Sequence, residues 1–448
     1  MSDRLESLTA RLLDAAARAG AEAADAVAVE GTSISIDVRG GALEQAERSE
    51  GTDIGLRVLI GRRQACVSAS DTSDATIATM ADRAVAMARE APEDAHAGLA
   101  DPGALARAWD LAALELADPA EDPSPAALEE AARRAEAAAL AVRGVAKVDG
   151  ASAGFSRRAS HLAASNGFAG GLARTSTGLG CTAITGSGTA MERDGAYESR
   201  LFAADMPGAE EIGQLAGERA VDRAGARKPP TGAFPVVYDE RISAGLIGHL
   251  LAAINGTAIA RGASWLRDAM GDQVLPAGLS LTEDPLRPRA SGSRPFDSEG
   301  LPTRRREIVA DGILRGWVLD LSTARKLGLD STANAGRSTG HPPAPSAHNI
   351  ALTPGAQGRD ALLADMGTGL LVTSLMGSSI NPNTGDYSRG ASGFWVQNGE
   401  IAYPVNECTL AGNLRDMLRR LTPANDARPH RSHLVPSLLV EGLTLAGE

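Results

Sequence analysis

The sequence predicts an α+β protein of two domains, an N-terminal α+β domain over residues 1–227 and a β-rich C-terminal domain over residues 228–448. The length of 448 residues exceeds the usual size of a single domain. Helical periodicities and strand patterns are both present in the first half, whereas much of the second half is rich in Gly and Ser with short strand-like runs. Between the halves lies Lys-Pro-Pro-Thr-Gly at 228–232, which cannot continue a helix or a central strand.

The N-terminal segment predicts an amphipathic helix followed by strands. Leu5, Leu8 and Leu12 recur at helical spacing between residues 2 and 19, and Gly20 is a glycine stop. A second helix is predicted over residues 74–90. Between the two helices, alternating apolar and polar residues separated by glycine turns predict strands at 26–29, 33–38, 54–59 and 64–69.

The middle of the chain predicts a helix, a return to strands and another helix. Ser124-Pro125 is a good helix start, because serine accepts bonds from free backbone N–H groups and proline fits the first turn. Residues 145–206 have strand patterning, and Asp194-Gly195 within them predicts a hairpin turn. Helical spacing resumes over residues 209–224.

The C-terminal half begins with a predicted strand at 235–238 and a nearly all-apolar, hence buried, helix at 240–254 closed by Asn255-Gly256. Short apolar runs then predict strands at 307–309, 369–373 and 393–396. Many short strands separated by Gly-rich turns are typical of a twisted or barrel-like β domain.

Charge and cysteine usage exclude several classes of protein. The formal net charge of −12 and the lack of a long basic stripe argue against nucleic-acid binding. Three widely spaced cysteines argue against a disulfide framework and favour a reducing cytoplasm. The N-terminus does not resemble a signal peptide, and no apolar stretch is long enough to cross a membrane.

Familiar catalytic motifs are absent or doubtful. No His-Glu-x-x-His pair occurs, and His430 and His433, although three residues apart, lie in a Pro- and Arg-containing segment that does not favour a metal site. Gly-x-Ser-x-Gly at 150–154 is followed by a strand pattern, not by the helix that a nucleophile elbow requires. His249, alone on its apolar helix, is expected to be a packed and hydrogen-bonded core histidine.

Several stretches resemble one family closely. The most specific stretch runs from Gly377 to Gly390 and continues through 393–400 and 403–405. The shorter matches lie at 411–417, 297–304, 323–328, 55–58 and 70–73. Together they resemble the TldD/PmbA metallopeptidase family, and within it the PmbA branch, also called TldE. The resemblance implies an N-terminal curved antiparallel sheet with helices and a C-terminal barrel-like β domain with few helices.

The resemblance also implies a zinc peptidase chemistry that this chain lacks. The catalytic branch carries a His-Glu-x-x-x-His helix and a later cysteine that hold zinc. The corresponding residues here are Ala244, Gly245 and His249, so one imidazole and the carboxylate are missing. Zinc needs about three protein ligands, and a lone imidazole cannot hold it tightly. We therefore expect no catalytic residue, no metal and no cofactor in this chain, and zinc in a partner subunit.

Members of this branch are expected, from the resemblance, to pair with a TldD-like catalytic paralogue in a heterodimer that cleaves unfolded or extended peptides. A homodimer is possible when the paralogue is missing, and neither a nucleic acid nor a membrane is an expected partner. The segment 377–390 is predicted to form a polar loop near the partner or the peptide chamber, or else a loop held by its own Asx-type turns. Its candidate contact residues are Ser378, Ser379, Asn381, Asn383, Asp386 and Tyr387.

Two other functions remain open from the residues. The chain could be an independent hydrolase whose nucleophile is Ser378, Ser379 or Cys408, although no histidine or lysine lies near Cys408 in sequence to activate its thiol. It could also be a scaffolding or binding protein with no role in proteolysis.

Overall fold

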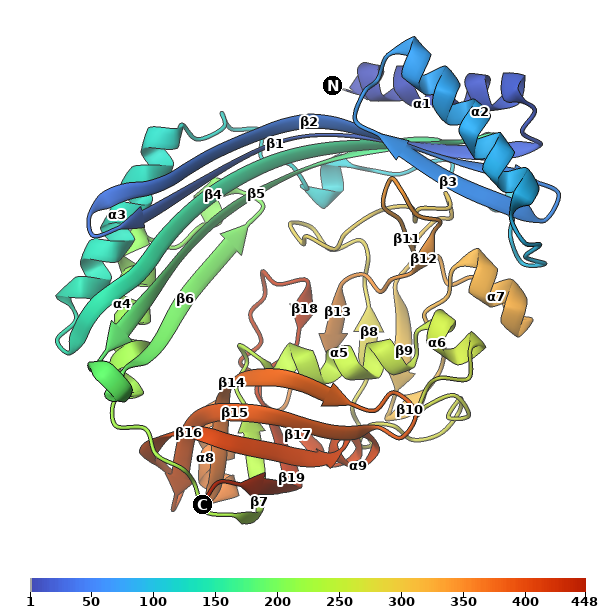
Figure 1. Ribbon diagram of the computed structural model, residues 1–448. Coiled ribbons are helices and arrows are strands. Elements are labelled where there is room, and N and C mark those ends of the chain that lie inside the picture. Colours follow the sequence, from blue (N-terminus) through green and yellow to red (C-terminus); the bar gives the residue numbers. More distant parts are fainter. Residues whose placement is uncertain (1) are drawn as a thin grey trace.

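The computed structural model describes residues 2–448, and a six-stranded antiparallel sheet in its N-terminal half forms an arch (Figure 1). We call it the arched sheet, with strand order β3-β2-β1-β4-β5-β6. Neighbouring strands are consecutive in sequence except β1 and β4, so the sheet is built largely from hairpins. The strands are β1 (Ala23–Arg39), β2 (Ala42–Ile60), β3 (Arg63–Ala69), β4 (Val145–Ala164), β5 (Ala169–Thr185) and β6 (Glu192–Arg200).

Four helices cover the convex face of the arched sheet (Figure 1). Both layers are rich in alanine, which lets helix backbones approach the sheet closely. The first pair packs on one half of the arch and the second pair on the other. The helices are α1 (Ser2–Ala19), α2 (Asp74–Glu90), α3 (Pro125–Ala141) and α4 (Ala209–Asp222).

The C-terminal region, residues 228–448, lies beneath the concave face of the arch (Figure 1). Five of its strands close into a barrel, because the last strand, β19, pairs with both β7 and β16. A sixth strand, β17 (Leu421–Pro423), pairs with β19 outside this ring. The barrel strands are β7 (Gly232–Tyr238), β14 (Gly369–Ile380), β15 (Asp386–Gln397), β16 (Glu400–Asn413) and β19 (Leu438–Ala446).

A smaller sheet and short helices complete the C-terminal region. Helices α5 (Ser243–Ala253) and α6 (Gly256–Ala260) lie between the barrel and the small sheet and share their apolar core. The small sheet has the order β10-β9-β8-β13-β18. Its strands are β8 (Leu281–Glu283), β9 (Arg306–Ala310), β10 (Ile313–Leu314), β13 (Ile350–Leu352) and β18 (His433–Leu434). The remaining elements are α7 (Leu321–Leu327), α8 (Arg359–Met366), α9 (Leu414–Arg419) and the ribbon of β11 (Ala335–Gly336) and β12 (Ala344–Pro345).

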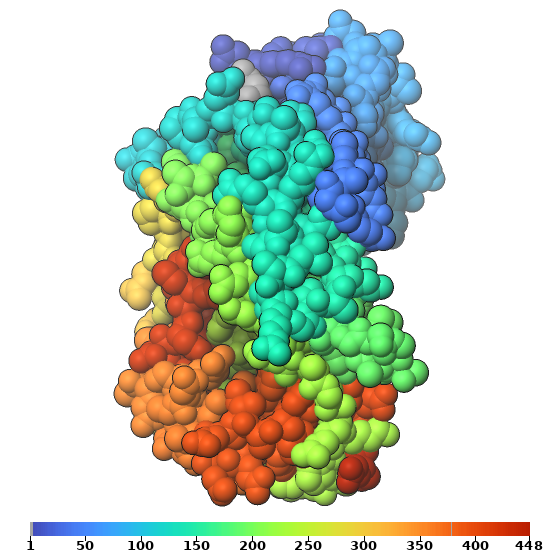
Figure 2. Space-filling model, turned by 90° about the vertical axis from the view of Figure 1, so that its left-hand side faces the viewer, coloured from blue at the N-terminus to red at the C-terminus, as the bar shows by residue number. Residues whose placement is uncertain are grey.

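Seen from the side of α3, the helices of the arch stand directly above the barrel, and the two layers meet along a seam (Figure 2). Arginines from the C-terminal region reach carboxylates of the N-terminal half across this seam. The pairs are Arg337 with Asp25, Arg241 with Asp194, Arg428 with Glu198, and Arg289 with Glu115 and Asp205. The α+β architecture, the curved antiparallel sheet and the barrel all confirm the predicted fold class.

Several predicted elements differ from the structure. The strands predicted separately at 26–29 and 33–38 are parts of one continuous strand, β1. Asp194-Gly195 is not a hairpin turn but lies inside β6, where Gly195 is needed because a Cβ there would stand 2.7 Å from the Cys181 carbonyl oxygen. The segment 377–390 is not one loop, since β14 extends to Ile380 and β15 begins at Asp386. Only residues 381–385 form the turn. No helix within residues 2–448 is long and apolar enough to cross a membrane.

Candidate functional site

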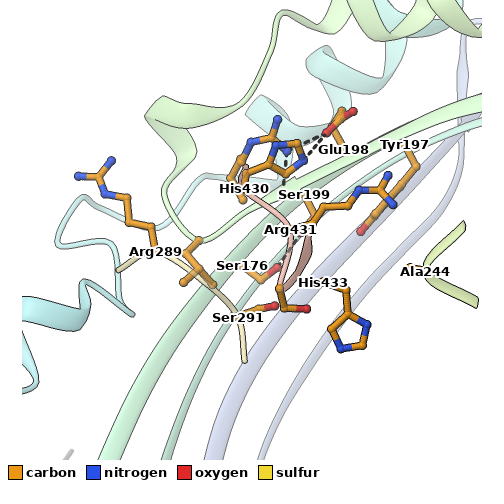
Figure 3. Close-up of a pocket in the computed structure, with 13 residues that line it drawn as sticks. Ser176, Tyr197, Glu198, Ser199, Ala244, Arg289, Ser291, His430, Arg431 and His433 are labelled. Atoms are coloured by element: carbon orange, nitrogen blue, oxygen red, sulfur yellow. Dashed lines mark hydrogen bonds and ion pairs between the residues drawn. The ribbon is translucent and has the colours of Figure 1, made fainter. Parts of the chain in front are cut away.

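A cavity of about 390 Å³ opens between the concave face of the arched sheet and the C-terminal region. Strands β5 and β6 supply one wall, through residues such as Ser176 and Tyr197, and the segment 430–433 supplies the other (Figure 3). Ala244, in the first turn of α5, also lines it. We call this space the Ala244 cavity. Ala244, where the resemblance implies the first histidine of His-Glu-x-x-x-His, therefore faces the space between the arched sheet and the C-terminal region.

Glu198 is the carboxylate of the Ala244 cavity, and its charge is already compensated. Arg200 Nη1 lies 2.7 Å from it and Arg428 forms a second ion pair. The imidazole Nε2 of His430 lies 3.3 Å away (Figure 3). Burial raises the pKa of Glu198, but these cations outweigh burial and hold it below its usual value. Such a carboxylate stays ionised and is a poor general base.

The histidines of the cavity are kept neutral. Burial, and then the Arg200 guanidinium, lower the pKa of His430, and burial lowers that of His433 as well. Both residues line the cavity, but only His430 lies beside Glu198 in Figure 3, and His433 lies apart from them. The cavity also offers hydroxyl groups, since Ser176 and Ser199 lie 3.2 Å apart on β5 and β6. This lining can form hydrogen bonds to a bound chain.

Helix α5 places the three residues of the altered motif differently. Ala244 is half-buried, Gly245 is exposed, and His249 lies one and a half turns further along the helix. The His249 ring packs edge-on against Tyr387, with 5.9 Å between centroids. Burial, followed by Arg389, lowers the pKa of His249. The predicted packing of His249 is confirmed by its contact with Tyr387, but the residue is half-buried and the predicted hydrogen bond is not found among the described side chains.

The turn at 381–385 is held by side chains of its own. Asn381 Oδ1 accepts bonds from the backbone N–H groups of Asn383 and Thr384, at 2.9 and 3.4 Å. The Asn413 amide donates to the Thr384 carbonyl and to Asp386, at 3.0 and 3.1 Å. The predicted Asx-type turn is confirmed. The candidate contact residues Ser379, Asn381, Asn383 and Asp386 are exposed, Tyr387 is buried, and the side chain of Ser378 lies outside the described part of the chain.

Two of the candidate nucleophiles, Cys408 and Ser379, lack activating partners among the described side chains, and the side chain of Ser378 lies outside the described part of the chain. Cys408 is buried in the barrel, donates to the Ala391 carbonyl at 3.2 Å, and has its pKa raised to about 11 by burial. A thiol with such a pKa is hardly ionised at neutral pH. Within residues 2–448, no histidine or carboxylate hydrogen-bonds to Ser379. Neither residue therefore has the base that a covalent mechanism requires.

Comparison with known proteins places this architecture in a family. Residues 24–88, 118–226 and 231–447 match the models of the PmbA/TldA metallopeptidase domain 1, central domain and C-terminal domain. Metalloprotease PmbA of Escherichia coli O157:H7 is 37% identical over 93% of this chain and 90% of its own length. The chain belongs to the PmbA/TldD metallopeptidase family.

Solved structures agree with the family in fold. A candidate modulator of DNA gyrase from Bacteroides thetaiotaomicron superposes with a TM-score of 0.92 at 28% identity, over 100% of this chain and 99% of its own. TldE from Thermococcus kodakarensis superposes with a TM-score of 0.86 at 19% identity, covering 98% and 100% of the two chains. The second likeness shows the shared fold alone.

The family name implies a catalytic metal, and the residues on α5 do not fit one. Ala244 offers a methyl group and Gly245 no side chain, while the remaining imidazole of His249 packs on an aromatic ring. Cys408 is engaged with a backbone carbonyl. Across the described residues 2–448, no three His, Cys, Asp or Glu side chains gather as a metal site.

Sequence reasoning found α5 but missed the cavity that its first turn faces. Glu198, His430 and Arg431 come from segments more than two hundred residues apart. The only sequence signal was the closely spaced pair His430 and His433, which was considered as a metal site and not favoured, and nothing in the spacing indicated an ion-paired carboxylate.

Proposed function

We propose that this chain is the non-catalytic, PmbA/TldE-like subunit of a heterodimeric metallopeptidase whose zinc lies in a TldD-like partner. The observation that carries the proposal is the donor set on α5, where a methyl group and a hydrogen stand in place of an imidazole and a carboxylate. Zinc-activated water requires several such donors. The partner, its zinc and the absence of any cofactor in this chain are parts of the same proposal.

The substrate that we propose is an unfolded or extended peptide. The concave face of the arched sheet carries small polar residues and opens into the Ala244 cavity. Residues 42–53 of β2 form a free strand edge within the described chain, because β3 pairs only with 54–60. Strand edges bind extended peptides through the backbone, with little sequence preference, and they also join subunits. Both roles suit a chamber shared by two chains.

Free cysteines favour a reducing compartment for this complex. Cys66, Cys181 and Cys408 are all unpaired in the described structure. Disulfide bonds persist in oxidising compartments and are rare in the cytosol. We propose the cytoplasm, and we propose that the chain associates with itself when the catalytic paralogue is missing.

The first test is metal content. The purified chain is expected to hold far less than one zinc per molecule after dialysis, measured by elemental analysis. One tightly held metal per chain would overturn the proposal. A paralogue containing His-Glu-x-x-x-His, purified in the same way, is the positive control.

The second test is co-expression with that paralogue. The two chains are expected to co-purify, and an unfolded protein such as casein is expected to be cleaved by the pair but not by this chain alone. Turnover by this chain alone would favour an independent hydrolase. Failure of the two chains to associate would favour scaffolding.

A further inference from the structure

A second cavity of about 280 Å³, separate from the Ala244 cavity, lies on the concave face of the arch and is lined by four arginines. Arg158 and Arg174 come from β4 and β5 of the arched sheet, and Arg294 and Arg337 come from the C-terminal region. We call it the arginine pocket. Asp297 is its one carboxylate, so the lining carries a clear excess of positive charge.

The arginines from the sheet are placed against each other. Arg158 and Arg174 are directly opposed in the register of β4 and β5, an arrangement that destabilises a sheet when the charges are alike. Arg174 is fixed there by donating to the carbonyl groups of Ser291 and Ser293. Burial, followed by Arg294 and Arg158, lowers its pKa to about 10. With this pKa the Arg174 guanidinium is still charged at neutral pH.

The arginines from the C-terminal region have unused donors. The Arg337 side chain is only 1% exposed, and one of its nitrogens pairs with Asp25. Its Nε and Nη2 atoms find no acceptor within residues 2–448, and neither does the buried Nε of Arg294. A buried charged donor that is left without an acceptor destabilises the folded state. These unused donors are evidence for a site that accepts an anion.

The nearby carboxylates are already occupied. Asp25 is shared between Arg337 and Arg57, whose Nε donates to it at 2.7 Å. Asp297 accepts three backbone N–H groups, from Glu299, Leu301 and Ala335, at 2.9–3.1 Å. Asp297 and Glu283 partly offset the charge of Arg294, but Arg174 has only burial and other arginines acting on it, and the pocket lining holds no further carboxylate for Arg158 and Arg174.

One side of the pocket is apolar. Its apolar lining consists of Val27, Val29, Leu162, Leu172 and Phe296. A free inorganic anion would gain nothing from this wall, whereas the last residue of a peptide has both a carboxylate and a side chain. Arginine forks bind carboxylates in a bidentate way.

The position of the pocket also suits a peptide. Arg174 of the arginine pocket and Ser176 of the Ala244 cavity are two residues apart on β5, on the same face and about 7 Å from each other along the strand. A chain ending in the arginine pocket can therefore continue into the Ala244 cavity. We propose that the arginine pocket binds the terminal carboxylate of an extended peptide and packs its last side chain against the apolar wall. This inference rests on the proposed function, since it names a subsite for that peptide.

The test measures binding to the purified full-length chain without any partner. The probes are the tripeptide Ala-Ala-Leu as the free acid, the same peptide amidated at its C-terminus, and inorganic phosphate. Each is titrated to about 10 mM while the thermal unfolding midpoint is followed, because a ligand of the folded state raises the midpoint. The free acid is expected to bind at least about tenfold more tightly than the amide, since a charge-assisted bidentate pair is lost on amidation.

Variants locate the effect. Arg294→Gln, at a guanidinium with no hydrogen bond to the described residues, is expected to bring the affinity for the acid down to that for the amide. Arg158→Gln, at an exposed position of β4, is the second variant in case the first does not fold, and should weaken binding of the acid severalfold. Arg143→Gln, exposed at the end of α3 away from the pocket, is the control and should change nothing.

Any of three results would overturn this assignment. The first is that the acid and the amide bind equally, and the second is that the acid does not bind at about 10 mM. The third is that both pocket variants bind the acid as tightly as the native chain does. If inorganic phosphate binds more tightly than the peptide acid, the pocket is a site for phosphate groups and the peptide assignment is overturned. Because the assay needs neither a partner nor cleavage, these outcomes are distinguishable from failure of the proposed heterodimer.

Discussion

Buried charges in this protein are concentrated where the arch meets the C-terminal region. Asp25 on β1 is the clearest case, because it is 3% exposed and lies between Arg57 and Arg337. Burial alone would raise the pKa of Asp25, but Arg337 and then Arg57 outweigh burial and lower it. The carboxylate is thus ionised whenever the protein is folded near neutral pH.

The variant Asp25→Asn tests how much the cluster of Asp25, Arg57 and Arg337 contributes to the free energy of unfolding. Removing the carboxylate leaves two buried guanidinium groups without their counter-ion, which should lower the free energy of unfolding by about 3–5 kcal/mol. Urea denaturation at neutral pH measures the loss. Asp74→Asn, which breaks the exposed pair with Arg11 at the start of α2, is the matched control and should lower the free energy of unfolding by at most about 1 kcal/mol. Equal behaviour of the two variants would contradict the expectation.

His348 predicts a dependence of stability on pH. Its ring is 3% exposed and its Nε2 lies 3.1 Å from the Ala333 carbonyl oxygen, so the neutral tautomer donates there. Burial, followed by Arg294, lowers its pKa from 6.5 to about 4. The folded state therefore binds fewer protons than the unfolded state between those values. Its contribution to stability is complete above about pH 6.5 and decreases as the pH falls toward 4, by at most about 3 kcal/mol.

The variant His348→Gln isolates this effect. Glutamine can still donate to the Ala333 carbonyl but does not titrate, so its unfolding free energy should fall less than that of the native chain between about pH 7 and 4.5. Asp297, with its pKa raised to about 6 by burial, contributes with the opposite sign in both proteins and cancels in the comparison. Parallel pH curves for the two proteins would show that His348 is not the group responsible.

At the scale of elements, local signals predicted the helices of the arch well. The predicted ranges of α1 and α2 agree with the structure, and Ser124 caps α3 by accepting from Ala127 N–H at 3.2 Å. These elements are specified by apolar spacing and by capping residues within a few positions. The hairpin turn predicted at Asp194-Gly195 was wrong because a glycine can also allow close packing between strands.

Replacing a glycine by alanine is expected to have opposite effects on stability in α4 and in α5. A Cβ at Gly213 of α4 would lie 2.0 Å from the Ala135 carbonyl oxygen of α3, whereas a Cβ at Gly248 of α5 would meet nothing within 4 Å. Alanine favours a helix over glycine by about 1 kcal/mol at either site. Gly248→Ala should therefore raise the thermal midpoint slightly, and Gly213→Ala should lower the unfolding free energy by about 1–3 kcal/mol. A stabilising Gly213→Ala would show that α3 and α4 can separate without cost.

At the scale of the whole molecule, the relation of the arch to the barrel was not predictable from local patterns. The barrel closes only because β19, at the end of the chain, pairs with β7 and β16. The Ala244 cavity likewise combines β5 and β6, the first turn of α5, and the segment 430–433. Spacing along a sequence does not reveal which distant segments meet, so the altered motif could be predicted and its surroundings could not.

The seam between the two layers gives the last prediction. Arg428 joins them by pairing with Glu198 of the arch and, at 2.5 Å, with Glu240 of the C-terminal region, and these side chains are 12–21% exposed. Arg428→Met should lower the free energy of unfolding by about 3 kcal/mol, because two partly buried carboxylates lose a shared partner. It should also speed hydrogen exchange in β6 and in the segment 428–434 before the rest of the molecule is affected. Arg48→Met, at an exposed pair on β2, is the control and should change neither quantity. Exchange that rises uniformly over the whole chain would mean that Arg428 supports global stability and does not specifically join the layers.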